Sequence, residues 1–166
     1  MSSLKAAPTD GSTFALTTPA ALTIFPHIYS NLSYDAVKDI VPVASVCTYF
    51  LAIVVNNKVP VKTLQEVWDW CKSNPDQATC GIPGTGTSIH FLAEKMEELT
   101  GAKLRLVPYK GAAALSQAVV TSEVACSINL SNNFTALHNA GKPKMLAISS
   151  RGGMQETPGV LVFPKW

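Results

Sequence analysis

The feature that most constrains the fold is an alternation of short apolar runs with amphipathic helical patterns along most of the chain. Apolar runs of strand composition alternate with segments whose apolar residues recur at helical spacing. Such alternation is typical of a layered α/β fold, so the sequence predicts a mainly parallel sheet covered by helices. The expected strands are residues 43–55 (one long strand or two short ones), a short run beginning at Thr79, and residues 104–107, 124–130 and 145–149; the expected helices are residues 64–73, 89–99, 112–120 and 134–139.

Start and stop signals mark two of these helices. Thr63 and Glu66 match a capping box, in which a hydroxyl and a carboxylate satisfy the first backbone N–H groups of a helix. Pro75 ends that helix, because the residue before a proline disfavours helical backbone. Gly101 ends the next helix, since glycine adopts the left-handed conformation without strain.

The first part of the chain has weaker patterns. Residues 13–17 have strand composition, and Thr18 with Pro19 matches the start of a helix, with the threonine as N-cap and the proline at the first helical position. Residues 20–28 are then expected to form a short helix that a proline ends or kinks. Residues 32–42 have the composition of an irregular surface connection.

A glycine-rich loop lies between the apolar run at Thr79 and the helix at residues 89–99. Its glycines and hydroxyl side chains, followed by the positive end of a helix, place N–H donors around one spot, which suits a small anion such as a carboxylate. An ordinary capped helix after a glycine-rich turn is the alternative. The residues predicted to bind a ligand here are Gly84, Thr85, Gly86, Thr87, Ser88 and His90, with Thr87 or Ser88 as N-cap and His90 as a ligand donor or a support for the loop.

Nucleotide chemistry does not fit this loop. Residues 81–88 have the spacing of a phosphate-binding P-loop, but Thr87 stands at the position of the lysine that neutralises phosphate charge. The dinucleotide fingerprint also fails, because Ile89 occupies the place of its third glycine. The chain has no G-x-S-x-G motif and no paired carboxylates at a telling spacing, so we expect no catalysis and no cofactor.

Polar residues after two other expected strands are further candidates. In α/β folds the ligand binds beyond the carboxyl ends of the strands, so loops that follow strands share one rim. Tyr109 can donate a hydrogen bond there, Lys110 can add a positive charge, and Asn129 can offer an amide. Thr18, at the other junction of strand and helix, completes the predicted set. Each of these residues is also common in ordinary turns.

The amino-acid composition argues against several classes of protein. Hydrophobic residues make up 47% of the 166 residues and charged residues 14%, which is enough apolar material for a packed core. The net charge of +2 is scattered, so no nucleic-acid surface is indicated. No apolar run is long enough to span a membrane, and the first residues lack the apolar core of a secretory signal.

The cysteines indicate no metal site. Cys47, Cys71, Cys80 and Cys126 form no C-x-x-C pair and no zinc spacing, so buried free thiols are expected. A disulfide such as Cys80–Cys126 requires that the two strands be neighbours.

Five segments in order resemble the substrate-binding proteins of tripartite tricarboxylate transporters. Residues 34–43 (YDAVKDIVPV) look like their Y-D-P-x-K-D-F-x-P-V segment, and residues 81–90 resemble their G-S-x-G-x-G-S-x-x-H loop. Residues 107–111 (VPYKG), 141–150 (GKPKMLAISS) and 10–13 (DGST) are similar to V-P-Y-K-G, A-G-K-x-R-x-L-A-V-T-S and D-G-Y-T.

The resemblance implies an extracytoplasmic solute receptor with a type II-like, periplasmic-binding-protein-like clamshell of two domains. It implies that residues 1–44 are a remnant of domain 1 with the crossover, that residues 45–150 are the ligand-binding α/β domain 2, and that residues 151–166 are an irregular tail. The expected ligand is a small carboxylic acid, and the expected partner is a membrane permease. The location is then periplasmic, or cytoplasmic if the chain is complete without a signal peptide.

Departures from the family pattern keep other functions open. From the resemblance we expect that the first glycine-rich loop of the family is not among these residues, and Ala125 and Asn129 replace two family aspartates. Pro19 and the residues after it replace polar residues at the first junction. A truncated remnant that binds no ligand, or an interaction module that forms a homo-oligomer through exposed sheet edges, is the main alternative. An enzyme acting on a carboxylate is a weaker one.

Overall fold

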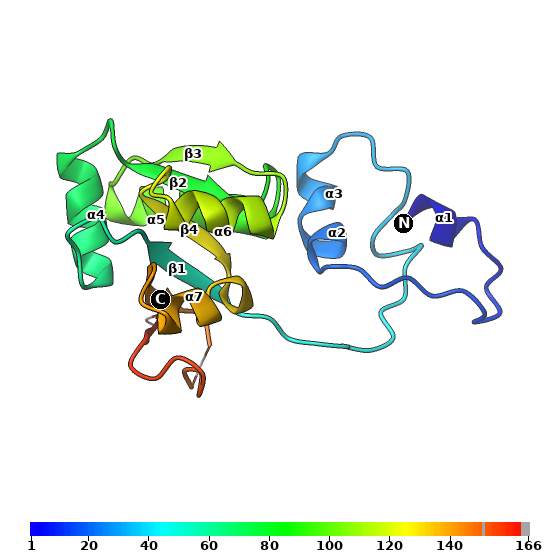
Figure 1. Ribbon diagram of the computed structural model, residues 1–166. Helices are drawn as coiled ribbons and strands as arrows, with labels where there is room; N and C mark the ends of the chain where they lie inside the picture. Colours follow the sequence, from blue (N-terminus) through cyan, green and yellow to red (C-terminus); the bar gives the residue numbers. More distant parts are fainter. Residues whose placement is uncertain (151, 164–166) are drawn as a thin grey trace. The chain divides into compact units, whose positions relative to one another are not determined.

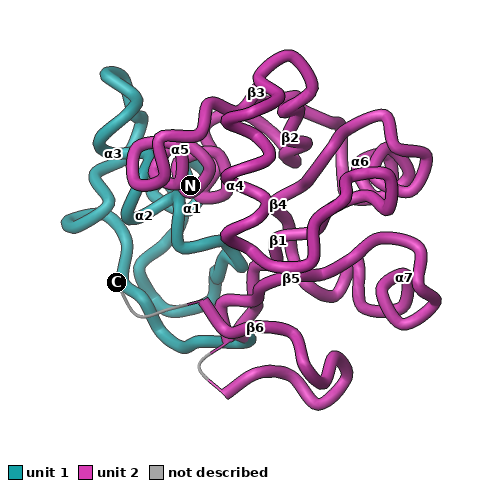
Figure 2. Tube along the Cα trace, turned by 90° about the vertical axis from the view of Figure 1, so that its left-hand side faces the viewer, with its two compact units in different colours: residues 1–47 teal, residues 48–166 magenta. Residues whose placement is uncertain are grey.

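The computed structural model describes residues 1–150 and 152–163, and the chain divides into two compact units (Figure 2). Unit 1 is Met1–Cys47 and unit 2 is Thr48–Trp166. The domain limits expected from the family, at residues 44 and 150, stay predictions. The expected irregular tail lies partly outside the described residues, at residues 151 and 164–166.

Unit 1 contains the short helices α1 (Ser2–Lys5), α2 (Ala20–Thr23) and α3 (Phe25–Ile28). An ion pair joins Lys5 Nζ to Asp39 at 2.7 Å, and the buried Tyr34 hydroxyl donates to the Ala21 carbonyl at 2.5 Å. The strand predicted at residues 13–17 is wrong: the segment is exposed and irregular. A strand needs a hydrogen-bonded partner, and the described residues of unit 1 contain none.

The helix predicted at residues 20–28 is divided in two at Ile24. Pro26 causes the break, because it has no N–H to donate and its ring crowds the preceding turn. The predicted N-cap is also wrong: Pro19 occupies that position, and no side chain caps α2. Thr18 is exposed.

Unit 2 is built on a six-stranded sheet of order β3-β2-β4-β1-β5-β6 (Figure 2), of which Figure 1 labels β1 to β4. The predicted α/β fold is confirmed. The last strand, Leu161–Val162, was not predicted from the sequence, because two residues are too few to show a pattern. The strands are β1 (Leu51–Val55), β2 (Thr79–Ile82), β3 (Arg105–Pro108), β4 (Cys126–Leu130), β5 (Lys144–Ile148) and β6 (Leu161–Val162).

The prediction of a mainly parallel sheet needs correction at β1. The pairs β2–β3, β2–β4 and β5–β6 are parallel, but β1 runs antiparallel to both β4 and β5. The expected strand at residues 43–55 is also shorter, because residues 43–49 are exposed and form no strand. Two consecutive strands of a sheet run parallel when a helical crossover connects them. No such crossover leads into β1, so this rule does not set its direction.

Helices cover both faces of this sheet. Successive residues of β1 point to opposite faces of the sheet: Ile53 packs in one buried cluster and Ala52 in the other. The first cluster contains apolar residues of α4 (Leu64–Ser73) and α5 (Ser88–Thr100). The second contains residues of α6 (Ala112–Val120) and Phe134, which follows the 3₁₀ turn η1 (Ser131–Asn133) and precedes α7 (Thr135–Asn139).

Local signals placed the ends of these helices correctly. The Thr63 side chain accepts a hydrogen bond from the Glu66 N–H at 3.2 Å, and the Glu66 carboxylate accepts from the Lys62 N–H at 2.7 Å. Gly101 adopts a left-handed conformation with φ 70° at the end of α5. Of the helices in the described ranges, none has both the length and the hydropathy that crossing a membrane requires.

Candidate functional site

The glycine-rich loop connects β2 directly to α5. Gly84 has φ 152° and Gly86 has φ 71°, which are conformations that residues with a Cβ rarely adopt. These two glycines let the chain leave the sheet and turn sharply into the helix. Thr85 is exposed between them.

Thr87 holds the loop closed and caps the helix. Its hydroxyl donates to the Gly84 carbonyl at 3.0 Å and accepts from the His90 N–H at 3.2 Å. The predicted N-cap is therefore Thr87 rather than Ser88. One side chain thus satisfies a loop carbonyl and an N–H group of the first helical turn.

His90 supports the loop from inside the helix. Its Nδ1 accepts a long hydrogen bond from the Gly86 N–H at 3.4 Å, and its Nε2 lies 3.5 Å from Glu94 Oε1. These contacts suit the neutral ring, with an acceptor toward the loop and a donor toward the carboxylate. Of the two roles predicted for His90, the contacts favour orientation of the loop.

The first turn of α5 presents backbone donors. Among the described residues, the N–H groups of Ser88 and Ile89 have no hydrogen-bond partner. Ser88 is half-buried and Ile89 is buried, and no acidic residue lies in the first turn. The site therefore has directed donors and the positive end of a helix dipole, and can hold an anion.

Strand register brings the predicted loops to one edge of the sheet. β3 runs parallel to β2 with Ile82 opposite Pro108, and the Tyr109 N–H donates to the Ile82 carbonyl at 2.9 Å. β4 runs parallel on the other side, with Gly81 opposite Ser127. The glycine-rich loop, the turn at Tyr109 and the end of β4 consequently share one rim.

The Tyr109 hydroxyl, predicted to donate to a ligand, has a partner within the protein. This hydroxyl donates to Glu123 Oε1 at 2.7 Å, and its ring packs near Gly81 over the sheet. A ligand at the rim would have to compete with Glu123 for this proton, so the ligand role of Tyr109 stays a prediction. Sequence reasoning missed Glu123, because nothing in a single sequence links residues on different elements.

Tyr109 is expected to titrate late. Burial and then the hydrogen bond to Glu123 raise the pKa of Tyr109 to about 12. This exceeds the ordinary tyrosine value of about 10, so its contribution to stability is complete below about pH 10 and is lost as the pH rises through about 12. Phenolate absorbance should show a late component that Tyr109→Phe lacks. A late component that persists in the variant would contradict this assignment.

The remaining predicted residues differ in their settings. Lys110 is exposed at the turn after β3, and no ion pair among the described residues includes it. Asn129 is buried; its Oδ1 accepts from the Leu130 N–H at 2.7 Å, and its Nδ2 has no partner among the described residues. Thr18 belongs to unit 1. Of the predicted residues in unit 2, Lys110 is therefore exposed and the polar residues of the loop are exposed or half-buried, whereas Asn129 is buried.

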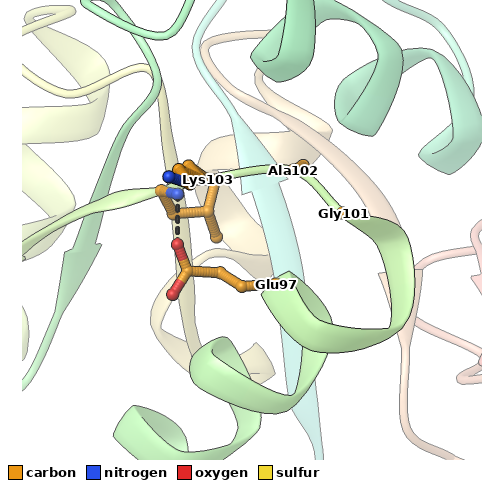
Figure 3. A pocket seen from close by; sticks show the side chains of 5 residues that line it. Glu97, Gly101, Ala102 and Lys103 are labelled. Atoms are coloured by element: carbon orange, nitrogen blue, oxygen red, sulfur yellow. Dashed lines mark hydrogen bonds between the residues drawn. The ribbon is translucent and has the colours of Figure 1, made fainter.

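A surface hollow of about 500 Å³ lies at the other end of α5 (Figure 3). Glu97, Gly101, Ala102, Lys103 and Leu104 line it, and the Glu97 carboxylate accepts a hydrogen bond from the Leu104 N–H. At about 1.5 Å per residue, the length of α5 separates this hollow from the glycine-rich loop. The hollow contributes nothing to the predicted site. Within the described ranges no cluster of side chains suits a metal ion.

Comparisons with known proteins agree with this fold. The sequence profile of the family described as "Tripartite tricarboxylate transporter family receptor" matches residues 1–163. The UPF0065 protein in the gbd 5′ region of Cupriavidus necator is 31% identical over 116 residues, which are 69% of this chain and 35% of that protein. Protein BugT of Bordetella pertussis is 27% identical over 152 residues, covering 91% of this chain and 47% of that protein.

Solved structures show the same architecture. A periplasmic transporter structure has a TM-score of 0.85 at 26% identity, covering 98% of this chain and 54% of that one. A Rhodopseudomonas palustris protein, Rpa4515 with adipate, has a TM-score of 0.83 at 23% identity over similar shares. The chain spans about half the length of these proteins. The resemblance inferred from sequence motifs is thereby confirmed: the chain belongs to the tripartite tricarboxylate transporter receptor family.

Proposed function

We propose that this chain binds a small carboxylate at the amino end of α5, as part of a periplasmic receptor that passes its ligand to a membrane permease. The observation that carries the proposal is the pair of N–H groups of Ser88 and Ile89, which have no partner among the described residues. Family membership supports the receptor role, its location and its transporter partner.

The site suits a carboxylate better than a larger phosphate group. A carboxylate accepts hydrogen bonds from two adjacent N–H groups and gains from the helix dipole. Nothing in the loop supplies the full positive charge that a nucleotide phosphate needs, since Thr87 replaces the lysine of a P-loop. Lys110, on the adjacent loop of the rim, adds longer-range attraction. Binding requires no chemical step, so we propose no catalysis.

Dicarboxylates are the first ligands to test. Two solved structures of this fold are those of Rpa4515 with adipate and of MatC from Rhodopseudomonas palustris with bound malate. Their identities of 23% and 24% establish the fold alone, so the ligands serve here to define a class of compounds. The expected homo-oligomer stays a prediction.

Titration calorimetry of the folded chain against adipate, malate and aromatic monocarboxylates tests the proposal. We expect Ser88→Asp to weaken binding of the best ligand at least about tenfold, because two like charges about 4 Å apart repel by about 4 kcal/mol at an effective dielectric of about 20. An acid in the first turn also favours the helix, so this variant should remain folded.

Gln65→Asp is the matched control. It adds the same charge to the first turn of α4, at an exposed position away from the glycine-rich loop, and should leave affinity unchanged. If no carboxylate binds to the folded chain, the proposed function of this chain is wrong. If Ser88→Asp binds as well as the original chain, the function stands but the site lies elsewhere.

A further inference from the structure

Three cysteines gather in the core on one face of the sheet. Cys71 comes from α4, Cys80 from β2 and Cys126 from β4, and their exposed fractions are 1%, 0% and 3%. All are free thiols, and Cys47 is a fourth, exposed one. The carboxylate site makes no use of these thiols.

Strand register places two of the thiols side by side. Cys80 is directly opposite Cys126 in the parallel pair of β2 and β4. Directly opposed residues of neighbouring strands point to the same face, and the strands lie about 4.8 Å apart. That spacing falls within the range of about 4.4–6.8 Å between Cα atoms that a disulfide spans. Cys71 approaches from a helix and has no such register.

Neither the Cys80 thiol nor the Cys126 thiol has a strong hydrogen-bond partner. The Cys126 thiol lies 3.6 Å from the Thr79 carbonyl, and the Cys80 thiol lies 4.0 Å from the Gly81 carbonyl. Sulfur–oxygen contacts of this kind are weak, so forming a disulfide sacrifices little hydrogen bonding.

We propose that Cys80 and Cys126 form a disulfide across the β2–β4 pair when the chain folds in the presence of a disulfide oxidant. One thiolate attacks the oxidant disulfide, giving a mixed disulfide and releasing one thiol. The second cysteine then displaces the other half as a second thiol. The two cysteines lose two electrons and two protons, and the oxidant gains them.

The burial of the two thiols determines when their disulfide can form. The neighbouring Cys80 thiol and burial raise the pKa of Cys126 well above its ordinary value. Thiolate is the attacking species, so the enclosed pair reacts poorly with an external disulfide. The bond consequently forms while the strands assemble, before the core closes. It ties the strand that leads into the glycine-rich loop to its neighbour.

Refolding the full chain from denaturant with reduced and oxidised glutathione tests the proposal. Mass spectrometry of unreduced peptides should find Cys80 linked to Cys126 with the loss of two hydrogen atoms. After unfolding of the refolded product, Cys71 should still react as a free thiol and Cys80 and Cys126 should not, whether or not the exposed Cys47 has taken up glutathione. The same oxidant added to the folded, reduced chain should modify Cys47 and leave the core pair reduced.

Cys71→Ala and Cys126→Ala provide matched comparisons, because each removes one buried thiol of the same cluster. The first variant should form the Cys80–Cys126 link as the original chain does, and the second should form no link to Cys80. A Cys71–Cys80 link as the main product would overturn the proposal. So would refolded original chain in which both Cys80 and Cys126 remain free thiols.

Discussion

Phe134→Ala is expected to destabilise unit 2 by about 3–5 kcal/mol, the cost of emptying a fully enclosed aromatic site. The Phe134 side chain is completely buried and packs in the cluster beneath α6, together with Ala52 and Val54 of β1. Removing it leaves a cavity that the sheet, fixed by its hydrogen bonds, cannot fill. Urea unfolding followed by the fluorescence of Trp68 and Trp70, both in unit 2, measures the loss.

Phe14→Ala is the matched control, with the same change of side chain at a residue that is 71% exposed. It should alter the free energy of unfolding by less than about 0.5 kcal/mol. Equal effects of the two changes would mean that Phe134 is not enclosed as described. Because Phe134 directly follows the turn after β4, its loss should also loosen the rim.

Gly81→Ala is expected to cost about 1–3 kcal/mol, although glycine and alanine differ by a single methyl group. A Cβ at residue 81 would overlap Leu115 Cδ1 and would lie 3.4 Å from Val124 Cγ2 and 3.5 Å from Tyr109 Cε2. Leu115 is a fully buried residue of α6, so it has little room to move. The closeness of α6 to the sheet therefore depends on Gly81. Thermal or urea unfolding measures the cost.

A double-mutant cycle isolates the cause. In a Leu115→Ala background the overlapping atom is gone, so Gly81→Ala should cost less than about 0.5 kcal/mol there. Gly152→Ala, at a glycine with no atom within 4 Å of the added Cβ, should be nearly neutral in the original chain. If Gly81→Ala costs the same in both backgrounds, contact with Leu115 is not the reason.

Local interactions explain why most helices were predicted closely. The helix expected at residues 112–120 is α6 (Ala112–Val120), and the caps at Thr63, Thr87 and Gly101 are those predicted. Caps and amphipathic spacing act over a few residues, so a single sequence contains them. The errors at residues 13–17 and 43–49 concern strands, which exist only when a distant segment pairs with them.

In the candidate site, too, the features made by neighbouring residues could be predicted, and those that depend on tertiary packing could not. The glycine-rich loop and its N-cap are contiguous, so their geometry follows from the glycines and the hydroxyl of Thr87. The destination of the Tyr109 hydroxyl could not be predicted, because Glu123 reaches it only after α6 has packed on the sheet. Burial of Asn129 likewise depends on what covers the end of β4.

For this protein, the sequence by itself determined the alternation of strands and helices, the helix ends, the turn of the glycine-rich loop into a helix and the family. Each depends on residues close together in the chain, or on motifs that occur in order along it. Only the tertiary structure decided the antiparallel direction of β1, the Tyr109–Glu123 hydrogen bond and the register that sets Cys80 opposite Cys126. Those features join segments far apart in sequence, and the packing of the whole sheet selects which segments meet.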